Sequence, residues 1–330
     1  MMVHGAAGLR PRVLVFAYHD LGAACLRVLL QQGAHLVGVV THEDDPGERI
    51  WFESVAAVAS RHGLSVFMPE DPNAPAFIAR VAALAPDLLF SFYYRRLLGP
   101  ALLALPRLGA VNLHGSLLPK YRGRAPLNWV LVHGETETGV TLHFMDDRAD
   151  HGDIIAQRAV PIAIEDTALT LWRKLVAAGE ALLAEAYPLL AEGRAPHQPQ
   201  DHAAATIMRR RTPADGCIDW SGSAWQIYNL IRAVTHPFPG AFTFLGERRV
   251  FVWQARPPVG RRAGAPGQIL GLGTEGLEVG TGAGGLELLR LQEAGGPERS
   301  GAEFLAVPGV AGGRFSSFPC ALAGESGGQV

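Results

Sequence analysis

The chain has 330 residues, of which 48% are apolar and 18% are charged, as expected of a globular protein with a sizeable core. This length favours two domains over one. The formal net charge of −2 supplies no overall positive field to attract phosphates, so we do not expect a nucleic-acid partner.

The first half of the chain alternates short apolar runs with segments of helical period. Continuous apolar runs predict buried strands at residues 13–18, 36–40, 65–67, 87–92 and 110–114. Apolar residues at helical spacing predict helices over residues 21–32, 52–62 and 77–84. Alternation of this kind is typical of α/β proteins, and it predicts a Rossmann-like, mostly parallel sheet with helices on both faces.

The turn after the first predicted strand argues against a dinucleotide cofactor. Residues 18–24 contain one glycine, Gly22, where the G-x-G-x-x-G fingerprint needs three. The turn therefore lacks the backbone clearance for a pyrophosphate. We expect no NAD chemistry.

From residue 218 the pattern changes to short strands separated by glycine-rich turns. We expect strands at residues 241–245, 250–255, 268–272 and 285–292, and a helix over 224–233. This pattern predicts a smaller β-rich domain, an open barrel similar to an OB fold. The expected organisation is a catalytic domain over 1–212, a C-terminal β-rich domain over 213–310 and a flexible tail over 311–330, with residues 192–201 as a surface connection.

Targeting and metal-binding signals are weak throughout the chain. The opening residues 1–5 lack the apolar core of a signal peptide, and the longest apolar runs are too short to span a bilayer. We therefore expect a cytoplasmic protein without membrane insertion. The three cysteines form no C-x-x-C pair, so we expect no metal site.

The segment from residue 111 to 153 carries the groups best suited to chemistry. Asn112 and His114 lie two apart on a predicted strand and therefore share one face of the sheet. An amide can stabilise a developing oxyanion, and an imidazole can move a proton near neutral pH. A second polar loop follows the predicted strand 139–144, and we expect both loops at the carboxyl edge of the sheet. Spacing alone leaves four carboxylates as partners for the imidazole: Asp146, Asp147, Asp150 and Asp153.

The run Asn112-Leu113-His114-Gly115-Ser116-Leu117-Leu118-Pro119, with Asp150 and Gly152 further along, resembles the signature of 10-formyltetrahydrofolate-dependent formyltransferases. The similarity extends from about residue 13 to 253 and includes blocks at 16–20, 91–95, 120–131, 134–143 and 210–213. Within this family, the chain is most similar to the formyltransferase half of the bifunctional UDP-4-amino-4-deoxy-L-arabinose enzyme of lipid A modification.

The resemblance implies three catalytic roles and a folate co-substrate. Asn112 would stabilise the tetrahedral intermediate, His114 would move the proton, and Asp150 would keep His114 basic. The formyl donor would be 10-formyltetrahydrofolate, and no metal would be needed.

The resemblance also implies binding residues. The folate would lie near Arg96, Leu97, Leu98, Arg124, Asp146, Asp147, Arg148 and Ala149. The close relative has His where this chain has Arg96, which makes main-chain contacts the expected mode there. Arg124 and Arg211 are candidates for the nucleotide diphosphate, because a guanidinium can bind phosphate bidentately.

These implications lead to a favoured reaction and several alternatives. The favoured reaction is N-formylation of UDP-4-amino-4-deoxy-L-arabinose, which is indicated by the block at 120–129. The alternatives are formylation of another nucleotide-linked amino sugar, formylation of methionyl-tRNA, and a binding-only relative. The partner would be a small-molecule nucleotide sugar, and the chain would be a monomer or a homodimer.

Overall fold

The computed structural model describes residues 10–44, 50–258 and 262–317. The chain forms two compact units from interleaved segments. The first unit contains residues up to 123, then 138–160 and 173–207, and the second contains 124–137, 161–172 and the residues from 208 onward. This division differs from the expected domains at 1–212 and 213–310. The reason is helix α5 (Pro126–Val132), which packs on helix α7 (Ala224–Val234) through Asn128 Nδ2, the donor to Ala233 O at 2.7 Å.

A seven-stranded sheet forms the centre of the first unit, in the order β3-β2-β1-β4-β5-β7-β8. Its strands are β1 (Arg12–Ala17), β2 (His35–Val40), β3 (Val66–Phe67), β4 (Leu88–Phe92), β5 (Ala110–His114), β7 (Glu137–Phe144) and β8 (Ile154–Pro161). Strands β3, β2, β1, β4 and β5 pair in parallel, whereas β7 pairs antiparallel with β5. The predicted mostly parallel sheet is confirmed, and β8 is an additional strand.

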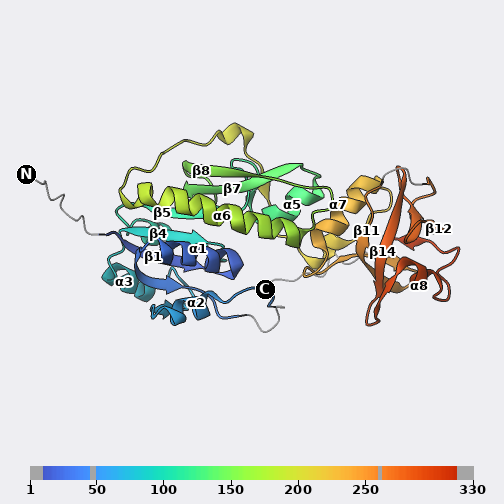
Figure 1. The fold of residues 1–330 in the computed structure, drawn as a ribbon, viewed down its shortest axis with the longest axis horizontal. Helices are drawn as coiled ribbons and strands as arrows, with labels where there is room; N and C mark the ends of the chain where they lie inside the picture. Colours follow the sequence, from blue (N-terminus) through green and yellow to red (C-terminus); the bar gives the residue numbers. More distant parts are fainter. Residues whose placement is uncertain (1–9, 45–49, 259–261, 318–330) are drawn as a thin grey trace, which may run out of the picture. The chain divides into compact units, whose positions relative to one another are not determined.

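Helices cover this sheet (Figure 1). They are α1 (His19–Gln31), α2 (Val55–Arg61), α3 (Pro75–Ala83), α4 (Pro100–Leu103) and α6 (Ala168–Ala191). Helix α2 begins later than expected because the Ser54 side chain caps it by accepting from the Ala57 N–H. Helix α6, which we did not predict, packs closely against β5 and α1 at Gly179. A Cβ at this glycine would lie 2.9 Å from both Leu113 on β5 and Leu21 on α1.

The second unit contains a smaller antiparallel sheet in the order β12-β13-β14-β11-β10-β16, with β15 paired to β14. Its strands are β10 (Ala241–Leu245), β11 (Arg248–Ala255), β12 (Ile269–Leu272), β13 (Leu277–Gly280), β14 (Gly285–Glu293), β15 (Glu298–Ser300) and β16 (Phe315–Ser316), and helix α8 is Gly301–Leu305. The two edges meet, because Ile269 N–H donates to Gly313 O and Phe315 N–H donates to Gly267 O. The sheet therefore curls towards a barrel, as predicted.

Short elements complete the chain: β6 (Arg122–Gly123), β9 (Ile207–Met208) and the 3₁₀ turns His202–Ala204 and Pro213–Gly216. Phe315, which falls within the expected flexible tail over 311–330, is buried in strand β16. Residues 318–330 of that segment lie outside the described residues. Among the described helices, none has the length and apolarity needed to cross a bilayer.

Candidate active site

Strand β5 presents Asn112 and His114 on the same face of the sheet. The antiparallel neighbour β7 places His143 opposite Asn112 and Thr141 opposite His114. His114 and His143 are nearly buried, at 6% and 2% exposure, whereas Asn112 is half-buried. The face therefore holds two imidazoles and one amide, with solvent access mainly at the amide.

The loop carrying Asp150 starts at a different place from the one expected. Strand β7 runs antiparallel to β5, so its last residue, Phe144, pairs with Val111, which precedes Asn112 on β5. The loop after β7 therefore begins away from the carboxyl edge of the parallel strands. The chain must return along the sheet to bring Asp150 to His114. Gly152 permits this course, since a Cβ there would lie 2.1 Å from Phe144 O.

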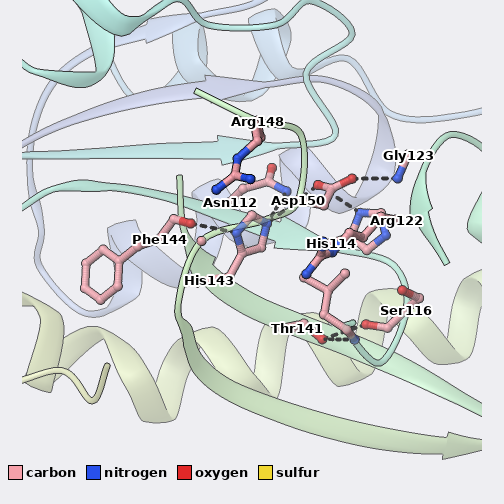
Figure 2. A network of polar contacts seen from close by, with 12 residues as sticks. Asn112, His114, Ser116, Arg122, Gly123, Thr141, His143, Phe144, Arg148 and Asp150 are labelled. Atoms are coloured by element: carbon pink, nitrogen blue, oxygen red, sulfur yellow. Dashed lines mark hydrogen bonds and ion pairs between the residues drawn. The ribbon is translucent and has the colours of Figure 1, made fainter. Parts of the chain in front are cut away.

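The His114 imidazole has an oxygen acceptor facing each ring nitrogen. Its Nε2–H donates to Tyr121 O at 2.8 Å. Its Nδ1 lies 3.4 Å from Asp150 Oδ1 (Figure 2). Asp150 also accepts the Gly123 N–H at 2.8 Å. Burial raises the pKa of the Asp150 carboxyl, but the charge of His114 and the hydrogen bond from the Gly123 N–H lower it by more. The Asp150 pKa therefore lies well below its ordinary value, and the carboxylate stays ionised.

His143 is a member of the site that sequence reasoning missed. Its Nδ1–H donates to Phe144 O at 2.8 Å, which leaves Nε2 to accept from Asn112 Nδ2 at 3.1 Å (Figure 2). The same Nε2 lies 3.6 Å from Asp150 Oδ1. This arrangement fixes both the tautomer of His143 and the orientation of the Asn112 amide. Strand alternation could have placed His143 on one face with Thr141, but its pairing with Asn112 depends on the β5–β7 register.

Backbone strain is concentrated beside His114. Tyr121 and Asp150, which both contact this imidazole, have φ angles of 58° and 54°, in the left-handed region that non-glycine residues avoid. Such conformations cost about 1–3 kcal/mol each and persist only where neighbouring groups hold them. The Tyr121 N–H, for example, donates to Thr206 Oγ1 at 2.7 Å. The geometry around His114 is thus held in place before any ligand binds.

The residues expected to contact a folate lie on two loops of the first unit. After β4, Arg96 and Leu97 are exposed and Leu98 is buried, and the Asn73 side chain holds this turn by bonding Leu97 O and Gly99 N–H. In the other loop, Asp146 accepts from the Arg148 N–H at 2.9 Å and from His151 Nδ1 at 2.7 Å. Asp147, Arg148 and Ala149 are exposed.

The two arginines expected to bind a diphosphate belong to the second unit. Arg124 is exposed, and its N–H donates to Met208 O at 3.0 Å. Trp129 carries two guanidinium groups over its ring, those of Arg211 at 4.7 Å and Arg209 at 5.5 Å from the centroid. Burial lowers the pKa of Arg211. Within the described part of the chain, no cluster of three His, Cys, Asp or Glu side chains has the arrangement of a metal site.

Two models of known protein families match the chain. A model of the formyl transferase family matches residues 12–187, over half of the chain, and a model of the C-terminal domain of formyl transferases matches residues 210–308.

Solved structures with the same fold have low sequence identity. An N-formyltransferase from Helicobacter canadensis, in complex with folinic acid and dTDP-3-aminofucose, is 19% identical with a TM-score of 0.64, over 86% of this chain and 100% of that one. The sugar 3N-formyl transferase WlaRD, with dTDP and 5-N-formyl-THF, is 17% identical with a TM-score of 0.63, over 87% and 98%. HypX from Aquifex aeolicus is 19% identical with a TM-score of 0.62 over 90% of this chain. This chain spans about half of HypX, 47% of its length.

Proposed function

The chain belongs to the formyl transferase family, and we propose that it transfers a formyl group from 10-formyltetrahydrofolate to the amine of a nucleotide-linked amino sugar. The observation that carries this proposal is a chain of contacts from the Asn112 amide through His143 to the ionised Asp150 carboxylate and on to the His114 imidazole. This set matches the needs of acyl transfer to an amine. Two sugar N-formyltransferases that share the fold across nearly their whole length support the acceptor class.

Each catalytic group has a role in this reaction. The neutral amine of the acceptor attacks the formyl carbon on N10 of the folate, forming the new C–N bond and an oxyanion. The Asn112 amide donates one N–H to His143, and its second N–H has no acceptor among the described residues and is available to the oxyanion. His114 moves the proton from the attacking amine to the departing N10 as the old C–N bond breaks. Asp150 stabilises the protonated imidazole. The products are an N-formyl sugar and tetrahydrofolate.

The binding residues follow from the same proposal. Arg96, Leu97, Leu98 and the loop of Asp146, Asp147, Arg148 and Ala149 would hold the folate. The exposure of Arg96 and Leu97 and of residues 147–149 fits this role, whereas Leu98 is buried and Leu97 O already accepts from Asn73. Arg124 would contribute to both ligands. Arg211, held over the Trp129 ring, would bind the diphosphate of the acceptor.

Among acceptors, we favour UDP-4-amino-4-deoxy-L-arabinose because of the sequence block at 120–129. A dTDP-linked amino sugar is the second candidate, since the Helicobacter canadensis enzyme is complexed with dTDP-3-aminofucose. Methionyl-tRNA is disfavoured by the net charge of −2.

The test is an acceptor panel with 10-formyltetrahydrofolate as the donor. The panel contains UDP-4-amino-4-deoxy-L-arabinose, dTDP-linked 3-amino and 4-amino sugars, and charged initiator methionyl-tRNA, with tetrahydrofolate release and product mass as readouts. Turnover with a nucleotide amino sugar supports the proposal, and the preferred base and sugar refine it. Turnover with the tRNA alone would overturn it.

A further inference from the structure

The connection after helix α6 contains a buried glutamine, Gln200, whose side chain contacts the loop of Asp150. The backbone of Gln198 exchanges two hydrogen bonds with Ile154, at 2.8 and 3.0 Å, which fixes this segment beside the start of β8. Two residues later, Gln200 is only 6% exposed. We expected residues 192–201 to form a surface connection, and the burial of Gln200 departs from that expectation.

The Gln200 amide uses both of its hydrogens on one loop. Its Nε2 donates to Asp150 O at 3.0 Å and to Gly152 O at 2.7 Å. These carbonyls belong to the segment in which Asp150 has its left-handed φ and Gly152 passes close to Phe144 O. Because both partners are acceptors, only a donor can fill this position.

The oxygen of the Gln200 amide binds a second loop, the one that contains Arg122. Gln200 Oε1 accepts from Arg122 Nε at 3.2 Å and from Arg122 Nη2 at 2.6 Å. Arg122 is itself buried, at 6% exposure, and its Nη2 also donates to His202 Nδ1 at 2.9 Å. No carboxylate among the described residues lies within ion-pair distance of the Arg122 guanidinium. Its neighbour Gly123 donates its N–H to Asp150 Oδ2. Gln200 therefore joins the loop of Arg122 and Gly123 to the loop of Asp150.

We propose that Gln200 is a positioning residue for formyl transfer, holding the Asp150 carboxylate against His114 through its bonds to both loops. The inference rests on the function proposed above. Gln200 itself contacts neither His114 nor Asn112 through any hydrogen bond in the described structure. Its effect is exerted on the backbone of Asp150, whose side chain must lie 3.4 Å from the His114 ring.

The substitution Gln200→Glu separates this role from simple packing. Glutamate has the same shape and can still accept from Arg122, but at neutral pH it cannot donate to the two carbonyls. Misplacing a catalytic group by about 1 Å can lower turnover by about 10²-fold, so we expect kcat to fall by about that factor. The KM for the nucleotide amino sugar should change by less than about 3-fold. Gln198→Glu is the matched control, since Gln198 is exposed and contacts Ile154 through its backbone.

Hydrogen exchange supplies a readout that does not depend on activity. In Gln200→Glu, and in Gln200→Met as a second variant of similar size without a donor, amides of residues 121–124 and 146–153 should exchange at least about 10-fold faster than in the parent, while helix α1 stays protected. Wild-type kcat in either folded variant, with or without faster exchange, would overturn the positioning role. If the parent protein itself formylates no nucleotide amino sugar, the proposed function fails. In that case, unchanged hydrogen exchange of residues 146–153 in the Gln200 variants would still refute the proposal that Gln200 fixes the Asp150 loop.

Discussion

Asn112 and His143 occupy directly opposed positions on the antiparallel strands β5 and β7, and the Asn112 amide donates to His143 Nε2 over 3.1 Å. His143 Nε2 can accept this bond because the ring proton is on Nδ1, where it is donated to Phe144 O. The amide is thereby held with its second N–H available for an oxyanion.

This relationship predicts unequal and non-additive effects of two substitutions. Asn112→Ala removes an oxyanion donor and should lower kcat by about 10²–10³-fold. His143→Phe leaves the amide in place but unoriented, and we expect a loss of about 10-fold. In the double variant, the second substitution should add almost nothing, because His143 acts through Asn112. Steady-state kinetics of the three variants would test this, and fully additive losses would contradict the coupling.

The ionised Asp150 predicts the effect of neutralising it. Asp150→Asn keeps an acceptor for the Gly123 N–H but removes the charge that faces His114 at 3.4 Å. Proton transfer by a positioned side chain contributes about 10²–10⁴-fold, so kcat should fall by at least about 10²-fold. The matched control is Asp201→Asn, because Asp201 is exposed and an asparagine there can still accept from the Ala203 N–H. Equal kcat values for the two variants would argue against a special role for Asp150.

The course of the Asp150 loop depends on Gly152. An added methyl group would lie 2.1 Å from Phe144 O, a backbone atom that cannot rotate away. Gly152→Ala should therefore destabilise the protein by about 1–3 kcal/mol and lower kcat with it. In Gly296→Ala, the nearest atom to the new Cβ is 3.4 Å away, an ordinary contact, and stability should be unchanged. Urea denaturation of both variants supplies the comparison, and similar stabilities would refute the steric argument.

The guanidinium of Arg211 over Trp129 predicts an effect on the acceptor alone. Arg211→Met should raise the KM for the nucleotide amino sugar by about 10-fold while kcat changes by less than about 2-fold, because a diphosphate contact is made equally in the ground and transition states. Arg210→Met is the control, since Arg210 is exposed beside it. A fall in kcat with an unchanged KM would assign Arg211 to the chemistry and not to binding.

A buried histidine predicts the pH dependence of stability. Burial and the charge of Arg95 lower the pKa of His19 to about 3. In the unfolded chain, His19 binds a proton near pH 6.5, whereas in the folded protein it does so only near pH 3. The contribution of the neutral His19 to the free energy of unfolding is therefore complete above pH 6.5 and is lost as the pH falls towards 3. The loss at pH 4 should be on the order of 3 kcal/mol. His19→Asn, in which Asn tolerates the left-handed backbone at this position (φ 65°), should lose less stability between pH 7 and pH 4.

The readout for this pH effect is the urea midpoint at the two pH values, followed by tryptophan fluorescence. The emission is the sum over six tryptophans and follows global unfolding, and one of them, Trp51, lies 4.6 Å from the His19 ring. Parallel losses of stability in the parent and the variant would show that His19 does not titrate on unfolding.

Local pattern predicted the elements, and long-range pairing determined the site. The apolar runs of β1, β4 and β5 are visible in the sequence because strands covered on both faces need continuous apolar residues. The His143–Asn112 contact depends on the register of β5 with β7. The Gln200 contacts depend on the return of residues 198–200 to β8. Neither pairing leaves a local signal.

The choice of carboxylate shows the same limit. Spacing alone left Asp146, Asp147, Asp150 and Asp153 as partners for His114. In the structure, Asp146 binds His151 at 2.7 Å, and Asp153 lies 3.5 Å from His197. Asp150, which has a left-handed backbone (φ 54°), faces His114 with its Oδ1 3.4 Å from the ring Nδ1. The family resemblance selected Asp150, whereas the residue pattern could not.

The most direct test of formyl transfer traces the formyl carbon itself. The protein is incubated with 10-formyltetrahydrofolate carrying ¹³C in the formyl group and with the nucleotide amino sugar preferred in the acceptor panel, and the sugar product is examined by mass spectrometry and NMR. We predict that the label appears as an N-formyl group on the sugar nitrogen with the parent protein and is absent with His114→Ala. Label recovered as free formate, with the sugar amine unchanged, would contradict the account.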